Sequence, residues 1–101
     1  MKTIMNYQEF ETILAKETFL VLAKTRNCSV CRAVSHQLSE ILKEDTKINA
    51  YELFLEDIPI FQGQCLVFTV PTIIIFFEGK EILRESRFID YLNITRILAL
   101  L

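Results

Sequence analysis

The sequence predicts an α/β domain in which helices cover both faces of a mixed β-sheet of four to five strands. Three observations lead to this fold class. Short β-branched segments alternate along the chain with segments of helical periodicity, an order typical of sheets covered by helices on both faces. The last two predicted strands flank a tight turn and should form an antiparallel hairpin. Only two glycines and two prolines occur in 101 residues, so most of the chain must be helix or strand.

The first half of the chain contains three predicted strands and two predicted helices. The strands are expected at Lys2 to Met5, Thr18 to Lys24 and Ile48 to Leu55, and the helices at residues 7–16 and Cys28 to Lys43. Asn6 followed by Glu9 resembles a capping box at the start of the first helix. The segment 18–24 is short, β-branched and rich in apolar residues, as in a buried strand. A polar loop at 25–27 and a charged turn from Glu44 to Lys47 complete this half.

The second half begins with a short helix or loop and ends with a hairpin and a helix. Asp57 to Gln64 carries Pro59 near its start, where a helix tolerates proline. Thr72 to Phe77 is the strongest strand signal, and the turn Glu78-Gly79-Lys80 leads into its expected partner, Glu81 to Ser86. The last helix is expected at Asp90 to Leu100. No repeat or linker interrupts the pattern, so residues 1–101 are expected to form a single domain.

Composition excludes several classes of function. The formal net charge is −2 and no basic block occurs, so we expect no nucleic-acid partner. The longest apolar runs, Phe19 to Ala23 and Ile73 to Phe77, are far shorter than a membrane span, and no signal-peptide pattern follows Met1. Three cysteines are an odd number, which disfavours a secreted disulfide scaffold. We therefore expect a cytoplasmic protein that does not associate with membranes, and we expect a monomer.

A C-x-x-C motif at residues 28–31 stands directly after a predicted strand and at the start of a predicted helix. A helix N-terminus points free N–H groups and the positive end of its dipole at the first cysteine. This arrangement favours the thiolate of Cys28 by lowering its pKa. Cys31 lies about one turn further on and nearer the core, so it can resolve a mixed disulfide on Cys28. Further positive charge is expected from Lys24, Arg26 and Arg32.

Two other interpretations of the cysteine pair remain. A structural zinc site needs a second pair of ligands, for which only Cys65 and His36 are available. His36 has a helical phase that points away from the apolar face of its helix. Cys65 is expected to pack as a small apolar side chain, and a regulatory or dimer-forming thiol is the alternative. We therefore expect no metal. Alternatively, the two cysteines pack at the helix start without any redox role.

Two segments together resemble the thioredoxin superfamily, in its small thioredoxin-like branch. The C-x-x-C follows FLVLAKTRN, and Val70-Pro71-Thr72 precedes IIIFFEGKEI, so the resemblance covers nearly the whole chain. It implies that Pro71 is cis and lies beside Cys28, and that the Val70 backbone pairs with an extended substrate segment. The substrate surface is expected to include Asn27, Ser29 and Val30. Without the family, Pro71 is simply a proline at the first position of a strand.

The chain also departs from the family pattern at positions that tune the cysteines. The usual Gly-Pro between the cysteines is Ser29-Val30, and the usual tryptophan before the first cysteine is Asn27. A buried aspartate six residues before that cysteine, credited with proton transfer for the second cysteine, is replaced by Leu22. An aromatic often found four residues before the first cysteine is Lys24, and the glycine after the fifth strand aligns near Arg87.

The function expected from these residues is thiol–disulfide oxidoreduction. Cys28 is the nucleophile, Cys31 is the resolving thiol, and Val70 with Pro71 forms the substrate platform. The expected substrates are disulfide-containing proteins or low-molecular-weight thiols. A partner reductase is the expected electron donor, and no bound cofactor is expected. The alternative is a non-catalytic thioredoxin-like adapter that binds proteins and whose C-x-x-C is slow or inert.

Overall fold

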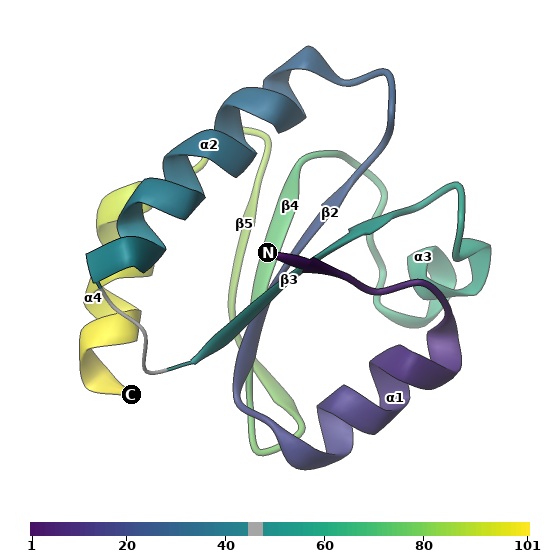
Figure 1. The fold of residues 1–101 in the computed structure, drawn as a ribbon, viewed down its shortest axis with the longest axis horizontal. Coiled ribbons are helices and arrows are strands. Elements are labelled where there is room, and N and C mark those ends of the chain that lie inside the picture. The colour runs from purple at the N-terminus through teal and green to yellow at the C-terminus, as the bar shows by residue number, and fades with distance from the viewer. Residues whose placement is uncertain (45–47) are drawn as a thin grey trace.

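A mixed β-sheet runs through the centre of the molecule, with helices on both sides (Figure 1). The structure is a computed structural model that describes residues 1–44 and 48–101. Within these residues, one sheet of five strands has the order β1-β3-β2-β4-β5. The strands are β1 (Lys2–Thr3), β2 (Phe19–Lys24), β3 (Asn49–Phe54), β4 (Thr72–Phe77) and β5 (Lys80–Ser86). The helices are α1 (Tyr7–Lys16), α2 (Ser29–Glu44), α3 (Pro59–Gln64) and α4 (Tyr91–Leu100). The predicted fold class is confirmed.

Strand β2 lies at the middle of the sheet and is buried on both faces. It pairs in parallel with β3 and antiparallel with β4. Its residues from Phe19 to Ala23 are fully buried, which explains why this strand is an uninterrupted apolar run rather than an alternating one. The chain continues from the end of β2 into the C-x-x-C loop, so this rigid strand positions the cysteine pair.

Two hydrophobic cores occupy the two faces of the sheet. One core packs α1 and α3 against Phe19, Val21 and Ala23 of β2. The other packs α2 and α4 against Leu20 and Leu22 of the same strand. In Figure 1, α2 and α4 accordingly lie on one side of the sheet and α1 and α3 on the other. The period-two alternation of β2 therefore supplies both cores at once.

Most predicted elements are confirmed, with small changes at their ends. β1 ends at Thr3, and the next residue, Ile4, is buried and donates its N–H to the Glu52 carbonyl at 2.8 Å. The first helix begins as predicted, because the Asn6 side chain accepts from the Glu9 N–H at 2.8 Å. The Glu9 carboxylate accepts from the Met5 N–H at 3.3 Å, one residue earlier than a capping box would have it.

The hairpin turn is tighter than predicted. Lys80 pairs with Phe77 and belongs to β5, so only Glu78 and Gly79 form the loop. Both have positive φ, 52° and 78°, as a two-residue type I′ turn requires. Of the predicted turn from Glu44 to Lys47, residues 45–47 lie outside the described part of the chain. None of the helices in the described ranges is long and apolar enough to cross a membrane.

Candidate active site

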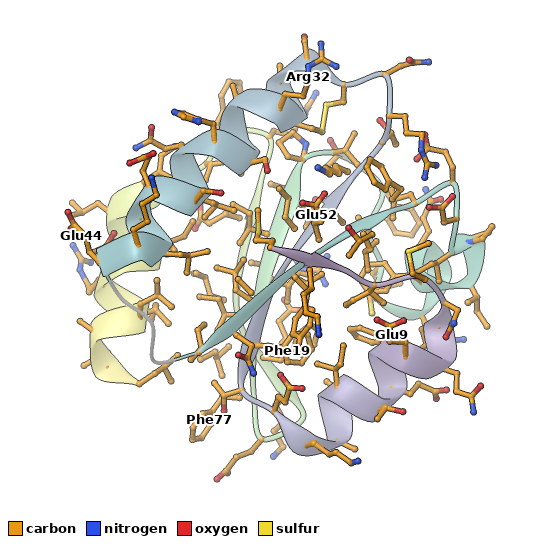
Figure 2. All side chains as sticks on the ribbon, in the orientation of Figure 1. Glu9, Phe19, Arg32, Glu44, Glu52 and Phe77 are labelled. Carbon is orange, nitrogen blue, oxygen red and sulfur yellow. A yellow bond between two sulfur atoms is a disulfide. The ribbon has the colours of Figure 1, made fainter. Side chains whose placement is uncertain are left out.

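Cys28 and Cys31 are joined by a disulfide at the start of α2, with Cα atoms 5.2 Å apart. Figure 2 shows this bond beside the labelled Arg32, at the end of the sheet where β2 leaves it. The helix begins at Ser29, one residue later than predicted, so Cys28 immediately precedes its first turn. Cys28 is partly exposed, whereas the Cys31 side chain is only 1% exposed. The two sulfurs therefore differ in access to a substrate.

The Cys28 sulfur takes the place of a helix-capping side chain. The Cys31 N–H donates to Cys28 Sγ at 3.1 Å, the same i to i+3 geometry by which Ser or Asp caps a helix. The Arg32 N–H also donates, at 3.4 Å, to the Cys28 carbonyl. A sulfur at this position meets the positive end of the helix dipole, which stabilises a thiolate there once the disulfide is reduced.

Two of the three cations expected to stabilise this thiolate are already paired with carboxylates. Arg26 forms a bidentate ion pair with Asp57, in which its two terminal nitrogens donate to the two carboxylate oxygens at 2.7 and 2.9 Å. Its side-chain hydrogen bond holds the pKa of the Asp57 carboxyl below the usual value. Lys24 pairs with Glu52 at 2.5 Å. The expectation that both cations act on Cys28 is therefore wrong, since each is neutralised locally by a partner from a distant segment.

The Lys24–Glu52 pair is nearly buried and was not foreseen from the sequence. The two side chains are 12% and 16% exposed, and the Lys24 ammonium lies 4.9 Å from the Phe54 ring centroid. Glu52 stands opposite Leu22 in the β2–β3 register. By strand alternation, Lys24 and Glu52 share the face of Leu22, the one that α2 covers. A carboxylate thus lies on this face although Leu22 supplies none.

Val70 and Pro71 lie at the same end of the sheet as the cysteine pair. Ala23, near the end of β2, pairs with Thr72 at the beginning of the antiparallel strand β4. The loop that follows β2 and the loop that precedes β4 are therefore neighbours. The Val70–Pro71 peptide bond is cis. Pro71 is buried and Val70 partly buried, and the Pro71 carbonyl accepts from the Arg87 N–H at 3.2 Å.

The remaining predicted surface residues are exposed around the disulfide. Asn27, Ser29 and Val30 are all exposed. Val30 lines a shallow apolar depression with Phe88, which is 90% exposed. A second depression lies between Val70 and the beginning of α3 and includes Phe68, which is 72% exposed. Apolar surface therefore occurs next to both the cysteine loop and the Val70–Pro71 loop.

Arg87 occupies the position where the family resemblance leads one to expect glycine. Its φ is 63°, in the left-handed region that favours glycine. Its N–H binds the Pro71 carbonyl, so the loop after β5 rests against the loop before β4. The backbone conformation expected for glycine is thus present with an arginine side chain.

Cys65 and His36 lie away from the pair. Burial raises the pKa of the Cys65 thiol to about 11, and this side chain packs against the core that contains α1 and α3. His36 is exposed on α2. Across residues 1–44 and 48–101, no three His, Cys, Asp or Glu side chains are grouped so that they could hold a metal ion.

Comparisons with known proteins agree with this architecture. The chain is 34% identical over 76 residues to the thioredoxin-like protein YdfQ of Bacillus subtilis (strain 168), an alignment that covers 75% of this chain and 67% of YdfQ. The fold matches Plasmodium falciparum thioredoxin with a TM-score of 0.86 at 15% identity, over 98% of this chain and 97% of that one. It matches mitochondrial thioredoxin 3 of Saccharomyces cerevisiae with a TM-score of 0.85 at 14% identity, over 100% and 95% of the two chains. No protein-family model matches the chain.

The architecture defines an α/β protein of the thioredoxin fold with a disulfide-forming C-x-x-C pair at a helix N-terminus. The chain belongs to the thioredoxin superfamily, as a small thioredoxin-like protein. The fold, the cysteine pair and the YdfQ relationship together support thiol–disulfide redox chemistry as its general activity.

Proposed function

We propose that this protein is a thiol–disulfide oxidoreductase in which Cys28 attacks and Cys31 resolves. The observation that carries the proposal is the unequal burial of two bonded cysteines at one helix N-terminus: Cys28 is partly exposed and Cys31 is 1% exposed. An accessible sulfur that meets backbone N–H groups is suited to nucleophilic attack. A shielded sulfur within bonding distance is suited to intramolecular closure.

Reduction of a substrate disulfide proceeds in two exchange steps. The Cys28 thiolate attacks one substrate sulfur, which forms a mixed disulfide and releases the other substrate sulfur as a thiolate. Cys31 then loses its proton and attacks Cys28 Sγ, which closes the Cys28–Cys31 disulfide and releases the second substrate thiolate. Two electrons pass to the substrate, and both released thiolates take up protons according to their pKa values. A partner reductase or a low-molecular-weight thiol returns two electrons to the pair.

The loop before β4 is proposed to hold an extended substrate segment beside Cys28. Among the described residues, no hydrogen bond engages the backbone N–H or C=O of Val70. A free backbone N–H and C=O can pair with an added strand. Exposed Asn27, Ser29 and Val30 border the same region and are proposed to contact the substrate.

The resolving step is proposed to be slow. Cys31 is 1% exposed. Leu22, on the sheet face that α2 covers, offers no carboxylate to take the thiol proton, and the Glu52 carboxylate on that face is held in its ion pair with Lys24. Burial in apolar surroundings disfavours a thiolate. The mixed disulfide on Cys28 should therefore persist, and turnover as a general reductase should be modest.

The odd number of cysteines supports a reducing compartment, the cytoplasm, as the place of action.

A binding module is the second candidate, and one observation favours it. Phe68 and Phe88 are 72% and 90% exposed, and each lines a depression beside the proposed site. Large exposed apolar side chains around a site are typical of protein-binding surfaces. In that case the pair remains a disulfide without turnover while the same surface holds a protein.

Trapping of the mixed disulfide distinguishes the two candidates. In a Cys65→Ala background, Cys31→Ser should accumulate a covalent adduct with a peptide disulfide, because attack still occurs and closure cannot. Cys28→Ser in the same background should form none. Mass spectrometry of both variants after incubation with the oxidised peptide reads out the result. If neither variant forms an adduct and the unmodified protein exchanges with no disulfide, the oxidoreductase proposal is refuted. The second candidate, a protein-binding module, then replaces it.

A further inference from the structure

The segment from Cys65 to Val70 connects α3 to the proposed substrate platform, and its first turn is unusual. Cys65 ends the helix, Leu66 has φ 55°, and the Val67 N–H donates to the Gln62 carbonyl at 3.0 Å. Val67 N–H to Gln62 is the 6→1 hydrogen bond of a Schellman ending, with leucine where glycine is usual. The turn directs the carbonyls of Cys65 and Leu66 towards β5, at the negative end of the helix.

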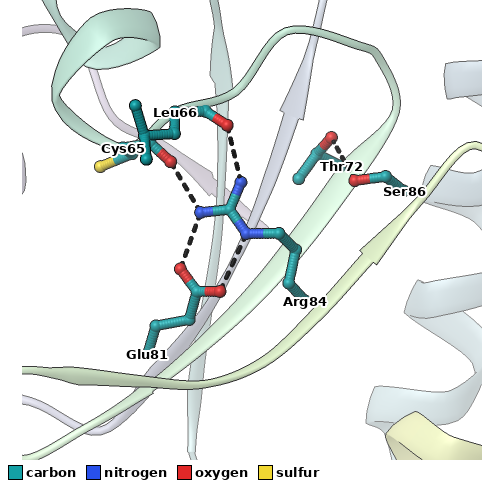
Figure 3. Close-up of polar contacts among 6 residues, drawn as sticks. All are labelled: Cys65, Leu66, Thr72, Glu81, Arg84 and Ser86. Atoms are coloured by element: carbon teal, nitrogen blue, oxygen red, sulfur yellow. Dashed lines mark hydrogen bonds and ion pairs between the residues drawn. The ribbon is translucent and has the colours of Figure 1, made fainter.

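Arg84 of β5 binds both of these carbonyls (Figure 3). Its two terminal nitrogens donate to the Cys65 carbonyl at 2.6 Å and to the Leu66 carbonyl at 3.0 Å. The other edge of the guanidinium donates to the Glu81 carboxylate at 2.9 and 2.7 Å. Glu81 thereby fixes the plane of a group that must reach two carbonyls at once. A lysine ammonium cannot reproduce this planar, two-sided set of bonds.

The far end of the segment is held by the first residue of β4, which itself contacts β5. Thr72, which is 1% exposed, donates its hydroxyl to the Thr69 carbonyl at 2.7 Å and lies 3.0 Å from the Ser86 hydroxyl. Ser86 and Arg84 are two residues apart on β5, so their side chains lie on one face. Residues 65–69 are thus bound at one end by Arg84 of β5 and at the other by Thr72 of β4. Val70 follows with its backbone unengaged among the described residues.

We propose that Arg84, oriented by Glu81, is a positioning residue that fixes the segment before Pro71 so that Val70 can pair with an extended substrate. This inference rests on the proposed function. Arg84 acts on recognition of a peptide and not on the sulfur chemistry, because its contacts are with Cys65, Leu66 and Glu81 and none is with Cys28 or Cys31.

Steady-state kinetics with two kinds of disulfide test this role. In Arg84→Gln, the KM for a synthetic extended peptide disulfide should rise about tenfold while kcat changes less than about twofold. The rate with bis(2-hydroxyethyl) disulfide, which has no peptide backbone, and the reduction potential of the cysteine pair should not change. Arg84→Lys should behave like Arg84→Gln, because a lysine ammonium cannot donate to both carbonyls and to the Glu81 carboxylate as the planar guanidinium does. Arg96→Gln, at an exposed position on α4, is the matched control.

Amide hydrogen exchange gives a measurement that does not depend on turnover. The amides of residues 66–70 should exchange about tenfold faster in Arg84→Gln, while those of α2 keep their protection. If the unmodified protein exchanges no disulfide, the proposed function is refuted. The amide exchange result would still test whether Arg84 fixes the segment before Pro71.

Two outcomes would overturn the role of Arg84. One is a folded Arg84→Gln protein with unchanged peptide KM and unchanged amide exchange in this segment. The other is an equal loss of rate with both disulfides, which would place the effect at the cysteines. Should Arg84→Gln not fold, Glu81→Gln keeps the arginine but removes its orienting carboxylate. A rise of about threefold in peptide KM is then expected, and no rise would overturn the proposal.

Discussion

Replacing Glu52 by Gln leaves the Lys24 ammonium without its carboxylate on the sheet face that α2 covers. The two side chains are 12% and 16% exposed and 2.5 Å apart. Removal of one partner from a fully buried pair costs about 3–5 kcal/mol, whereas exposed pairs contribute about 0–1 kcal/mol. With roughly one-seventh of each side chain accessible, we expect Glu52→Gln to lower the free energy of unfolding by about 2–3 kcal/mol.

Urea unfolding followed by far-UV circular dichroism measures this loss. A domain of this size should also lose about 8–15 °C in Tm. The double variant Lys24→Met with Glu52→Leu should lie within about 1 kcal/mol of the unmodified protein, because both charges then leave the face together. Glu40→Gln removes one partner of an exposed pair in which the side chains are 51% and 69% exposed. It should change stability by less than about 0.5 kcal/mol and serves as the control.

The reasoning would be refuted if Glu52→Gln matched this control. It would also be refuted if the double variant were as unstable as the sum of its two single variants. Either result would mean that solvent reaches the pair and that the face beneath α2 does not need both charges. The full double-mutant cycle therefore decides whether the two side chains act as a unit.

Three further outcomes are expected. Burial raises the pKa of the Cys65 thiol to about 11, so the unfolded chain releases this proton at lower pH than the folded protein does. The free energy of unfolding should therefore fall between about pH 9 and 11, by about 1 kcal/mol once half exposure of the side chain is allowed for. Cys65→Ala should show a shallower fall of the urea midpoint over the same pH range. Leu22→Asp should destabilise by about 3 kcal/mol or more, since a fully buried side chain becomes a carboxylate beside Glu52. If it folds and reduces insulin no faster, proton loss from Cys31 does not limit turnover. Glu78→Asn should raise stability by about 0.5 kcal/mol in thermal melts, because asparagine tolerates φ near 52° at this type I′ turn better than glutamate.

The fold followed from the sequence because its signals are local. The helical spacing after Asn6, the continuous apolar segment of β2 and the sharp turn at Gly79 each depend on residues within one element. The order of these elements then restricts the sheet to few topologies. The Val70-Pro71-Thr72 anchor completed the family resemblance, and the fold comparisons agree with it.

Element ends were less well predicted, since pairing partners decide them. The strand predicted at residues 2–5 ends at Thr3, and Ile4 follows it with its N–H bound to the Glu52 carbonyl. Lys80 joins β5 because Phe77 lies opposite it. Glu52 is far from Ile4 in the chain, so no local pattern could have set that boundary. Phe77 is only three residues from Lys80, and the boundary there is set by the two-residue loop that Glu78 and Gly79 form with positive φ.

The sequence by itself determined the placement of Cys28 and Cys31 at the start of a helix that follows a strand, because both elements are read from patterns of neighbouring residues. Only the tertiary structure decided which charges surround the pair. Lys24 and Arg26 look like free cations beside Cys28, yet Glu52 and Asp57 neutralise them from β3 and the loop after it. The contacts of Arg84 with the carbonyls of Cys65 and Leu66 also could not be predicted from the sequence, because these residues are far apart along the chain. The physical reason is that Coulomb and hydrogen-bond energies depend on distance in space, which sheet register sets, whereas sequence patterns report only neighbours along the chain.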